Sequence, residues 1–200
     1  MSSDYFERLW ASLPGELEPP ELEIRRRFLL DEVRGGGRVL DLGCGTGVFT
    51  AMLAQAGAQV VGVEVAEAAL ARARHAHPEL DFRLAPNGGR LPFEDRDFEL
   101  VWASEVIEHI ADTERWLQEI RRVLVPEGRL LLTTPNHPRA ALFLYGLERY
   151  SAPLSDHLHL YTCRSLKAVL DEFGFEAVTV RPAAGPPLLR RMLLARAVRS

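Results

Sequence analysis

The fold of this chain is decided by the stretch Val39-Leu40-Asp41-Leu42-Gly43-Cys44-Gly45-Thr46-Gly47. The residues before the first glycine belong to a short apolar segment, Arg38–Leu42, that predicts a buried strand. Glycines at every second position then predict a tight turn, and the segment Thr46–Ala56 predicts a helix directly after it. A strand, a glycine turn and a helix in this order are typical of a parallel α/β sheet.

The same alternation of strand and helix continues along the chain. Further strands are expected at Gln59–Glu64, Asp81–Leu84, Phe98–Ala103 and Arg129–Thr133, with helices over Glu67–His75, Asp112–Leu124 and Arg164–Phe173. The last two strands, Glu176–Arg181 and Leu189–Val198, are joined by a short link rich in proline and glycine, which predicts an antiparallel hairpin. The predicted fold class is therefore α/β, a Rossmann-like, doubly wound and mostly parallel seven-stranded sheet with an antiparallel C-terminal hairpin.

Residues 1–35 stand apart from this pattern and are predicted to form a helical lid segment. Residues 36–200 are predicted to form one domain, with a long insert at Pro135–Leu160. Within the lid segment, the run Arg25-Arg26-Arg27 is expected on the solvated face of a helix. Aromatic residues of the lid segment and of the insert are expected either to close over a functional site or to pack on the edge of the sheet; they are Tyr5, Phe6, Trp10, Phe143, Tyr145 and Tyr150.

Composition and charge exclude several classes of protein. The chain has 200 residues, of which 47% are hydrophobic and 26% charged, as in soluble globular domains. We expect no membrane span, and Met1–Trp10 lacks the basic and apolar regions of a signal peptide. The two cysteines, Cys44 and Cys163, are too few for a disulfide scaffold, so a cytoplasmic location is expected. A net charge of −4 argues against non-specific binding of nucleic acid.

The glycine turn is also the strongest indication of a ligand site. Its spacing is G-x-G-x-G, whereas dinucleotide-binding turns have G-x-G-x-x-G facing a pyrophosphate. Asp41 lies just before the first glycine, where a carboxylate would repel a pyrophosphate and attract an ammonium group. Glu64 ends the second strand, where an acid can accept hydrogen bonds from two ribose hydroxyls. These residues predict a cofactor with a ribose and an amino-acid group.

On these residues the chain resembles the class I S-adenosylmethionine-dependent methyltransferases, over about Gly36–Val198. The resemblance implies that the glycine loop faces the methionine part of the cofactor, that Glu64 holds the ribose, and that Asp41 matches the first acid of the loop. In the family an acid before a Leu-Pro-Phe run often binds the adenine amino group, and Asn87 takes its place here. The predicted cofactor-binding residues are Asp41, Gly43, Cys44, Gly45, Glu64, Asn87, Gly88 and Ser104.

Polar residues after the fourth strand are expected at the reaction centre, because ligands of such sheets lie outside the carboxyl ends of the strands. In a helical turn Glu105, Glu108 and His109 would share one face, at i, i+3 and i+4. A second polar cluster, Asp156-His157-Leu158-His159, lies in the insert on the same rim of the predicted sheet.

The run Glu-x-x-Glu-His, with a later histidine four residues before Tyr161-Thr162, is similar to metal-dependent methyltransferases. These are the small-RNA 3′-end 2′-O-methyltransferases and the ubiquinone-pathway O-methyltransferases. The resemblance implies four ligands of a divalent metal (Mg, Mn, Fe, Co or Zn): Glu105, Glu108, His109 and His157. Such a cation lowers the pKa of a bound hydroxyl, so that an alkoxide or phenolate forms near neutral pH. Two alternatives stay open: His109 or His157 acts as a general base without a metal, or the cluster only orders a loop.

The sequence thus predicts an S-adenosylmethionine-dependent methyltransferase that acts on a small-molecule acceptor, with oxygen as the favoured acceptor atom. The acidic net charge makes RNA 2′-O-methylation the weaker alternative. A non-enzymatic S-adenosylmethionine-binding partner subunit is a rival, although it would have no need of the acid–histidine set. A nicotinamide-dependent dehydrogenase is opposed by Asp41 and by the glycine spacing. A monomer or a homodimer is expected.

Overall fold

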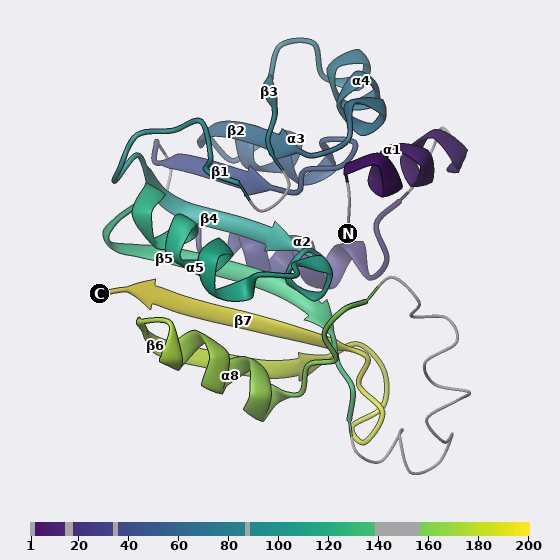
Figure 1. Ribbon diagram of the computed structural model, residues 1–200. Helices are drawn as coiled ribbons and strands as arrows, with labels where there is room; N and C mark the ends of the chain where they lie inside the picture. The colour runs from purple at the N-terminus through teal and green to yellow at the C-terminus, as the bar shows by residue number, and fades with distance from the viewer. Residues whose placement is uncertain (1–2, 15–17, 34–35, 87–88, 139–156) are drawn as a thin grey trace.

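The computed structural model describes residues 3–14, 18–33, 36–86, 89–138 and 157–200, and a seven-stranded sheet lies at its centre (Figure 1). The strands are β1 (Arg38–Leu42), β2 (Gln59–Glu64), β3 (Asp81–Leu84), β4 (Phe98–Ser104), β5 (Leu124–Pro135), β6 (Phe175–Ala183) and β7 (Met192–Arg199). Their order across the sheet is β3-β2-β1-β4-β5-β7-β6. The first five strands pair in parallel, whereas β7 is antiparallel to both β5 and β6. The predicted sheet with its antiparallel C-terminal hairpin is confirmed.

Helices cover both faces of this sheet, because successive strand residues point to opposite faces. Leu100 and Trp102 of β4 belong to the same buried cluster as residues of α2 (Leu22–Leu30) and α3 (Val48–Gln55). Their neighbours Val101 and Ala103 belong to the cluster formed with α5 (Thr113–Val123) and α8 (Cys163–Glu172), which lie in front of the sheet in Figure 1. The remaining helices are α1 (Ser3–Ser12), α4 (Glu67–Ala76) and the short 3₁₀ helix η1 (Ile107–His109).

Capping residues determine where two helices begin. Asp112 precedes α5, and its side chain accepts a hydrogen bond from the backbone N–H of Arg115 (3.0 Å). Thr162 precedes α8, and its side chain and that of Ser165 satisfy each other's backbone N–H groups in a capping box. Both helices were expected within a residue of these positions.

Strand β5 is longer than the expected Arg129–Thr133. It begins at Leu124, directly after α5, and bends at Glu127 and Gly128, where the pairing with β4 shifts register. Glu127 has a positive φ of 61°, which lets the chain bulge without leaving the sheet. At its other end β5 continues to Pro135 and thereby brings Thr133 and Thr134 to the rim where the functional side chains gather.

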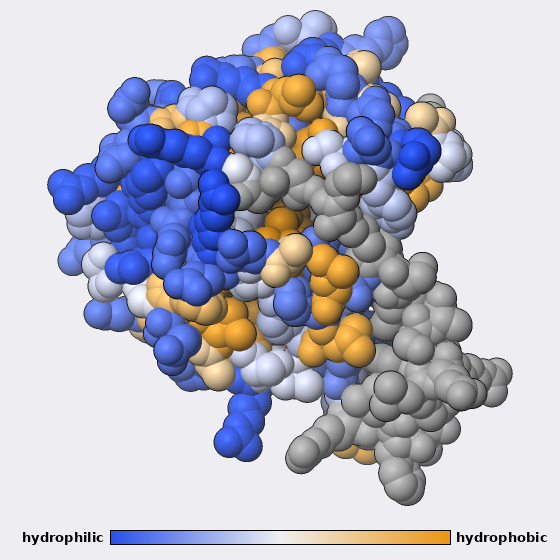
Figure 2. Space-filling view, in the orientation of Figure 1, coloured by the Kyte–Doolittle hydropathy of each residue, from blue (hydrophilic) through white to orange (hydrophobic). Residues whose placement is uncertain are grey.

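On the face shown in Figure 2 the surface is mostly hydrophilic, with apolar patches between the charged groups. Large exposed hydrophobic side chains in the described ranges include Leu158 and Leu160, which flank His159. The predicted insert is described only at its ends, so Phe143, Tyr145, Tyr150 and Asp156 lie outside the described residues. Among the residues that are described, no helix has the length and the apolar character needed to cross a membrane.

Candidate functional site

The glycine loop after β1 has a backbone shape that only glycine adopts readily. Gly43 has a φ of 82°, in the left-handed region that side chains disfavour. A Cβ added at Gly43 would also lie 2.5 Å from Cγ2 of Val106, so this residue allows the loop to approach the segment after β4. The N–H groups of Gly43 and Cys44 donate to the carbonyl oxygen of Val63 (2.8 and 3.0 Å), which ties the loop to β2.

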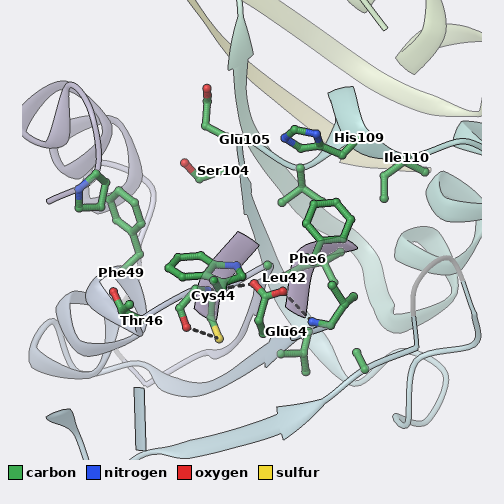
Figure 3. Close-up of a pocket in the computed structure, with 18 of the residues that line it drawn as sticks. Phe6, Leu42, Cys44, Thr46, Phe49, Glu64, Ser104, Glu105, His109 and Ile110 are labelled. Carbon is green, nitrogen blue, oxygen red and sulfur yellow. Dashed lines mark hydrogen bonds between the residues drawn. The ribbon is translucent and has the colours of Figure 1, made fainter. Parts of the chain in front are cut away.

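Glu64, at the end of β2, is hydrogen-bonded to the same loop. Its carboxylate accepts hydrogen bonds from the N–H groups of Gly45 (3.2 Å) and Val65 (2.7 Å) (Figure 3). Only 7% of the residue is exposed, and this burial raises the pKa of its carboxyl above the usual value. An ionised carboxylate has about four lone-pair sites, so Glu64 keeps acceptor capacity toward a ligand in the cavity.

Asp41 lies beneath the loop, and it is not among the residues that line the cavity in the described part of the chain. Its buried carboxylate accepts a hydrogen bond from the hydroxyl of Thr50 (2.6 Å). Burial, together with the nearby charge of Glu64, raises the pKa of Asp41 to about 7, against the lowering effect of Thr50. The structure thus places Asp41 away from the cavity wall, where its hydrogen bond joins β1 to α3 on the two sides of the glycine loop.

A cavity of about 310 Å³ joins the glycine loop to the residues after β4. Cofactor residues predicted from the sequence that line it are Gly43, Cys44, Gly45, Glu64 and Ser104. Cys44, Glu64 and Ser104 are labelled in Figure 3. On its other side are Glu105, Val106 and His109, together with apolar residues of the N-terminal segment. The predicted residues Asn87 and Gly88 lie outside the described residues, although Pro86 and Gly89 on either side of them line the cavity.

Three of the four predicted metal ligands lie close together. Glu108, His109 and His157 each offer a ligand atom, and these three atoms lie within 4.8 Å of one another. Glu108 is 1% exposed; one of its oxygens accepts a hydrogen bond from Thr134 (2.9 Å), and the other, Oε1, is buried without a hydrogen-bond partner among the described residues. Burial and the charge of Glu105 raise the pKa of Glu108 well above its usual value.

Glu105 differs from the expectation. The structure has only the short 3₁₀ helix η1 after β4, and Glu105 precedes it with a positive φ of 56°. Its carboxylate accepts a hydrogen bond from Thr133 (2.9 Å) and lies 3.3 Å from the guanidinium of Arg25. The expected helical face of Glu105, Glu108 and His109 does not form, because the chain turns between Glu105 and Ile107. Glu105 is consequently outside the group of three.

Arg25 was expected on a solvated face, and this is wrong. The residue is 3% exposed and lines the cavity, and its guanidinium donates to the hydroxyl of Ser104 (3.3 Å). Arg27, by contrast, is exposed. The signal that was missed is the helical spacing, because Phe28 and Leu29 stand three and four residues after Arg25 and are buried with it.

Two further histidines near this cluster have different environments. His159 is part of the loop structure, because its Nε2 lies 2.9 Å from the carbonyl oxygen of Ile110. His137, which the sequence left unassigned, is 2% exposed, and its backbone N–H donates to the carbonyl oxygen of Tyr161 (2.9 Å). Burial, with a smaller effect of His157, lowers the pKa of His137 to about 4.

Comparisons with known proteins identify the family of the chain. A family profile described as a methyltransferase domain matches residues 16–180. The demethylmenaquinone methyltransferase of Beutenbergia cavernae is 36% identical over 136 residues, which cover 65% of this chain and 56% of that protein. The mitochondrial ubiquinone biosynthesis O-methyltransferase of Bos taurus is 31% identical over 158 residues, 72% of this chain and 43% of that protein. The chain thus spans about half the length of these curated relatives.

Solved structures share the fold. An S-adenosylmethionine-dependent methyltransferase from Mesorhizobium loti has a TM-score of 0.70 at 22% identity and covers 90% of this chain and 97% of that chain. Phosphoethanolamine N-methyltransferase 2 of Haemonchus contortus, in complex with phosphomonomethylethanolamine and S-adenosylhomocysteine, has a TM-score of 0.77 at 19% identity and covers 97% of this chain and 57% of that chain.

Proposed function

The chain belongs to the methyltransferase domain family of S-adenosylmethionine-dependent enzymes, and from this premise we propose that it methylates an oxygen atom of a small molecule. The observation that carries the proposal is that the glycine loop and His109 line the same cavity. Methyl transfer needs the acceptor atom, the methyl carbon and the sulfur in line, and a shared cavity places cofactor and acceptor next to each other. The net charge of −4 favours a small molecule over RNA as the acceptor.

For the cofactor, we propose that Glu64 binds the ribose and that Gly43, Cys44 and Gly45 face the methionine part. The methionine part carries a carboxylate, and Arg25 is a buried cation on the wall of the same cavity. An arginine pairs well with a carboxylate in such a place, so we assign this contact to Arg25. Adenine recognition by Asn87 and Gly88 stays a proposal from the sequence.

For the acceptor, we propose that Glu108, His109 and His157 hold a divalent metal. The donors fit, because one carboxylate and two imidazoles within 4.8 Å suit several divalent metals, and the buried Glu108 Oε1 lacks a hydrogen-bond partner among the described residues. A metal bound there lowers the pKa of an acceptor hydroxyl. Glu105 was the fourth predicted ligand, and its ion pair with Arg25 favours a site of three side chains. The alternatives are His109 or His157 as a general base, and a cluster that only orders a loop.

Metal analysis of protein purified without chelators tests the metal site. We expect a stoichiometric divalent metal in the wild type and its loss in Glu108→Gln, which keeps the shape of the side chain. Glu99→Gln, an exposed site on β4, is the matched control and should retain the metal. Equal and negligible metal in all three proteins would contradict the metal site and leave the two alternatives, a general base or a cluster that only orders a loop.

The reaction itself is tested with labelled S-adenosylmethionine and a panel of diols, catechols, acids and amines. We expect transfer of label to a hydroxyl acceptor. Transfer only to amines would overturn O-methylation while leaving the methyltransferase assignment intact.

A further inference from the structure

Helix α1 places apolar side chains over the cavity without burying them. Phe6, Leu9, Trp10 and, just beyond the helix, Leu13 line the cavity at the spacing of one helical face. None of the residues of α1 is buried. The apolar face of this helix is therefore only half-buried, and a molecule that fills the cavity would cover it further.

Helix α1 and the residues just after it are tied to α4 by hydrogen bonds. The carboxylate of Glu7 accepts a hydrogen bond from the backbone N–H of Ala68 (3.0 Å), in the first turn of α4. Arg72 of α4 donates to the carbonyl oxygens of Leu13 and Pro14, both at 2.8 Å. These bonds orient the helix and leave its apolar face toward the cavity.

Two residues of this face contact different halves of the site. A Cβ added at Gly45 would lie 3.1 Å from the indole of Trp10, so the indole covers the glycine loop. The ring of Phe6 meets the imidazole of His109 edge-on, with 5.7 Å between ring centroids and 84° between planes (Figure 3). His109 in turn lies 5.0 Å from His157. One turn of helix thus connects the cofactor loop to the acceptor side.

We propose that Phe6 is a positioning residue for His109, and that bound cofactor strengthens the contact between the two rings. Cofactor in the cavity covers the apolar face of α1, which docks the helix and presses Phe6 against the imidazole. The proposal rests on the proposed function, because it takes the cavity as the cofactor site. Linkage makes the effect mutual, so whatever fixes His109 also strengthens cofactor binding. Cofactor binding and the fixed position of His109 consequently favour each other.

The test is a titration of the full chain with S-adenosylhomocysteine, followed by NMR of labelled histidine and tryptophan side chains. In the wild type we expect shifts of both the Trp10 indole N–H and the His109 ring, the latter assigned by its loss in His109→Gln. In Phe6→Leu we expect weaker binding of S-adenosylhomocysteine and, at saturating ligand, a shifted Trp10 but a loss of most of the His109 shift. Phe6→Tyr keeps the ring and should restore it. Arg8→Ala, at an exposed residue of α1, is the matched control and should behave as wild type.

Different failures have different meanings. If S-adenosylhomocysteine binds but His109 shifts equally in wild type and Phe6→Leu, or in neither, the positioning role is wrong and the proposed function stands. If the wild type does not bind S-adenosylhomocysteine, the cofactor site itself is wrong, and this inference falls with it.

Discussion

The cofactor side and the acceptor side of the cavity are built in different ways. The cofactor side is a backbone structure: one continuous stretch, residues 39–47, turns through glycines and hydrogen-bonds to Val63 and Glu64 of the neighbouring strand. The acceptor side is formed by side chains from distant segments: Phe6 from α1, Glu108 and His109 from η1, and His157 from the end of the insert, with Arg25 of α2 at the boundary with the cofactor side. The cofactor side should tolerate almost no change of backbone conformation. The acceptor side should be sensitive to the substitution of single side chains.

The largest effect on stability and on cofactor binding is expected from a substitution at Gly43, where the two sides of the cavity touch. Gly43→Ala adds a Cβ 2.5 Å from Val106 at a φ of 82°. Backbone strain of about 1–3 kcal/mol, and the clash in addition, should lower the free energy of unfolding and abolish binding of S-adenosylhomocysteine. The measurements are urea unfolding and calorimetric titration.

Gly57→Ala is the matched control for this substitution. Gly57 has a similar φ of 88°, but an added Cβ would meet nothing within 4 Å. Gly57→Ala should therefore lower the free energy of unfolding by the backbone strain alone, and it should bind S-adenosylhomocysteine as the wild type does. Equal losses in the two variants would mean that the contact of Gly43 with Val106 has no role.

The next effect concerns Asp41, whose buried side chain joins β1 to α3 on the two sides of the glycine loop. Its pKa in the folded protein is raised to about 7, so the folded state holds a proton that the unfolded state has released. The stability from this group is complete below the unfolded pKa of about 4 and is lost as pH rises toward 7. At ~1.4 kcal/mol per pKa unit the loss is of the order of 4 kcal/mol.

Asp41→Asn keeps the size of the side chain and cannot ionise. Its free energy of unfolding should fall less than that of the wild type between pH 4 and pH 7. Parallel stability curves for the two proteins would show that Asp41 is ionised in the folded state throughout.

A smaller effect is expected from one side chain at the boundary, Arg25. Arg25→Ala removes a buried guanidinium. It should lower the affinity for S-adenosylhomocysteine by roughly 10- to 100-fold, which is the scale of one charge-assisted hydrogen bond. Binding of 5′-methylthioadenosine, which lacks the amino-acid group, should change much less. Arg26→Ala, whose guanidinium is bonded to Glu23 at the surface, is the control and should bind both as wild type does. An equal loss for both ligands in Arg25→Ala would rule out the carboxylate contact.

The same contrast explains what the sequence predicts well. The loop at 39–47 and Glu64 are predictable because a strand, glycines at fixed spacing and an acid at a strand end are local patterns with one backbone solution. The sheet order and the hairpin follow from the alternation of elements and from one short link.

The acceptor side was less predictable because its contacts join distant segments. The burial of Arg25 depends on where α2 packs, and Arg26 and Arg27 next to it have the same chemistry but not the same environment. The turn at Glu105 depends on the ion pair with Arg25 and the hydrogen bond from Thr133, which lie 80 residues before it and 28 residues after it (105 − 25 and 133 − 105). Helical spacing alone therefore grouped Glu105 with Glu108 and His109.

The central claim is that the cavity is an S-adenosylmethionine site, and thermal unfolding with two ligands tests it most directly. S-adenosylhomocysteine at about 100 times its dissociation constant should stabilise the wild type by ~2.7 kcal/mol, whereas NAD at the same concentration should not change the midpoint. Stabilisation by NAD and none by S-adenosylhomocysteine would contradict the account.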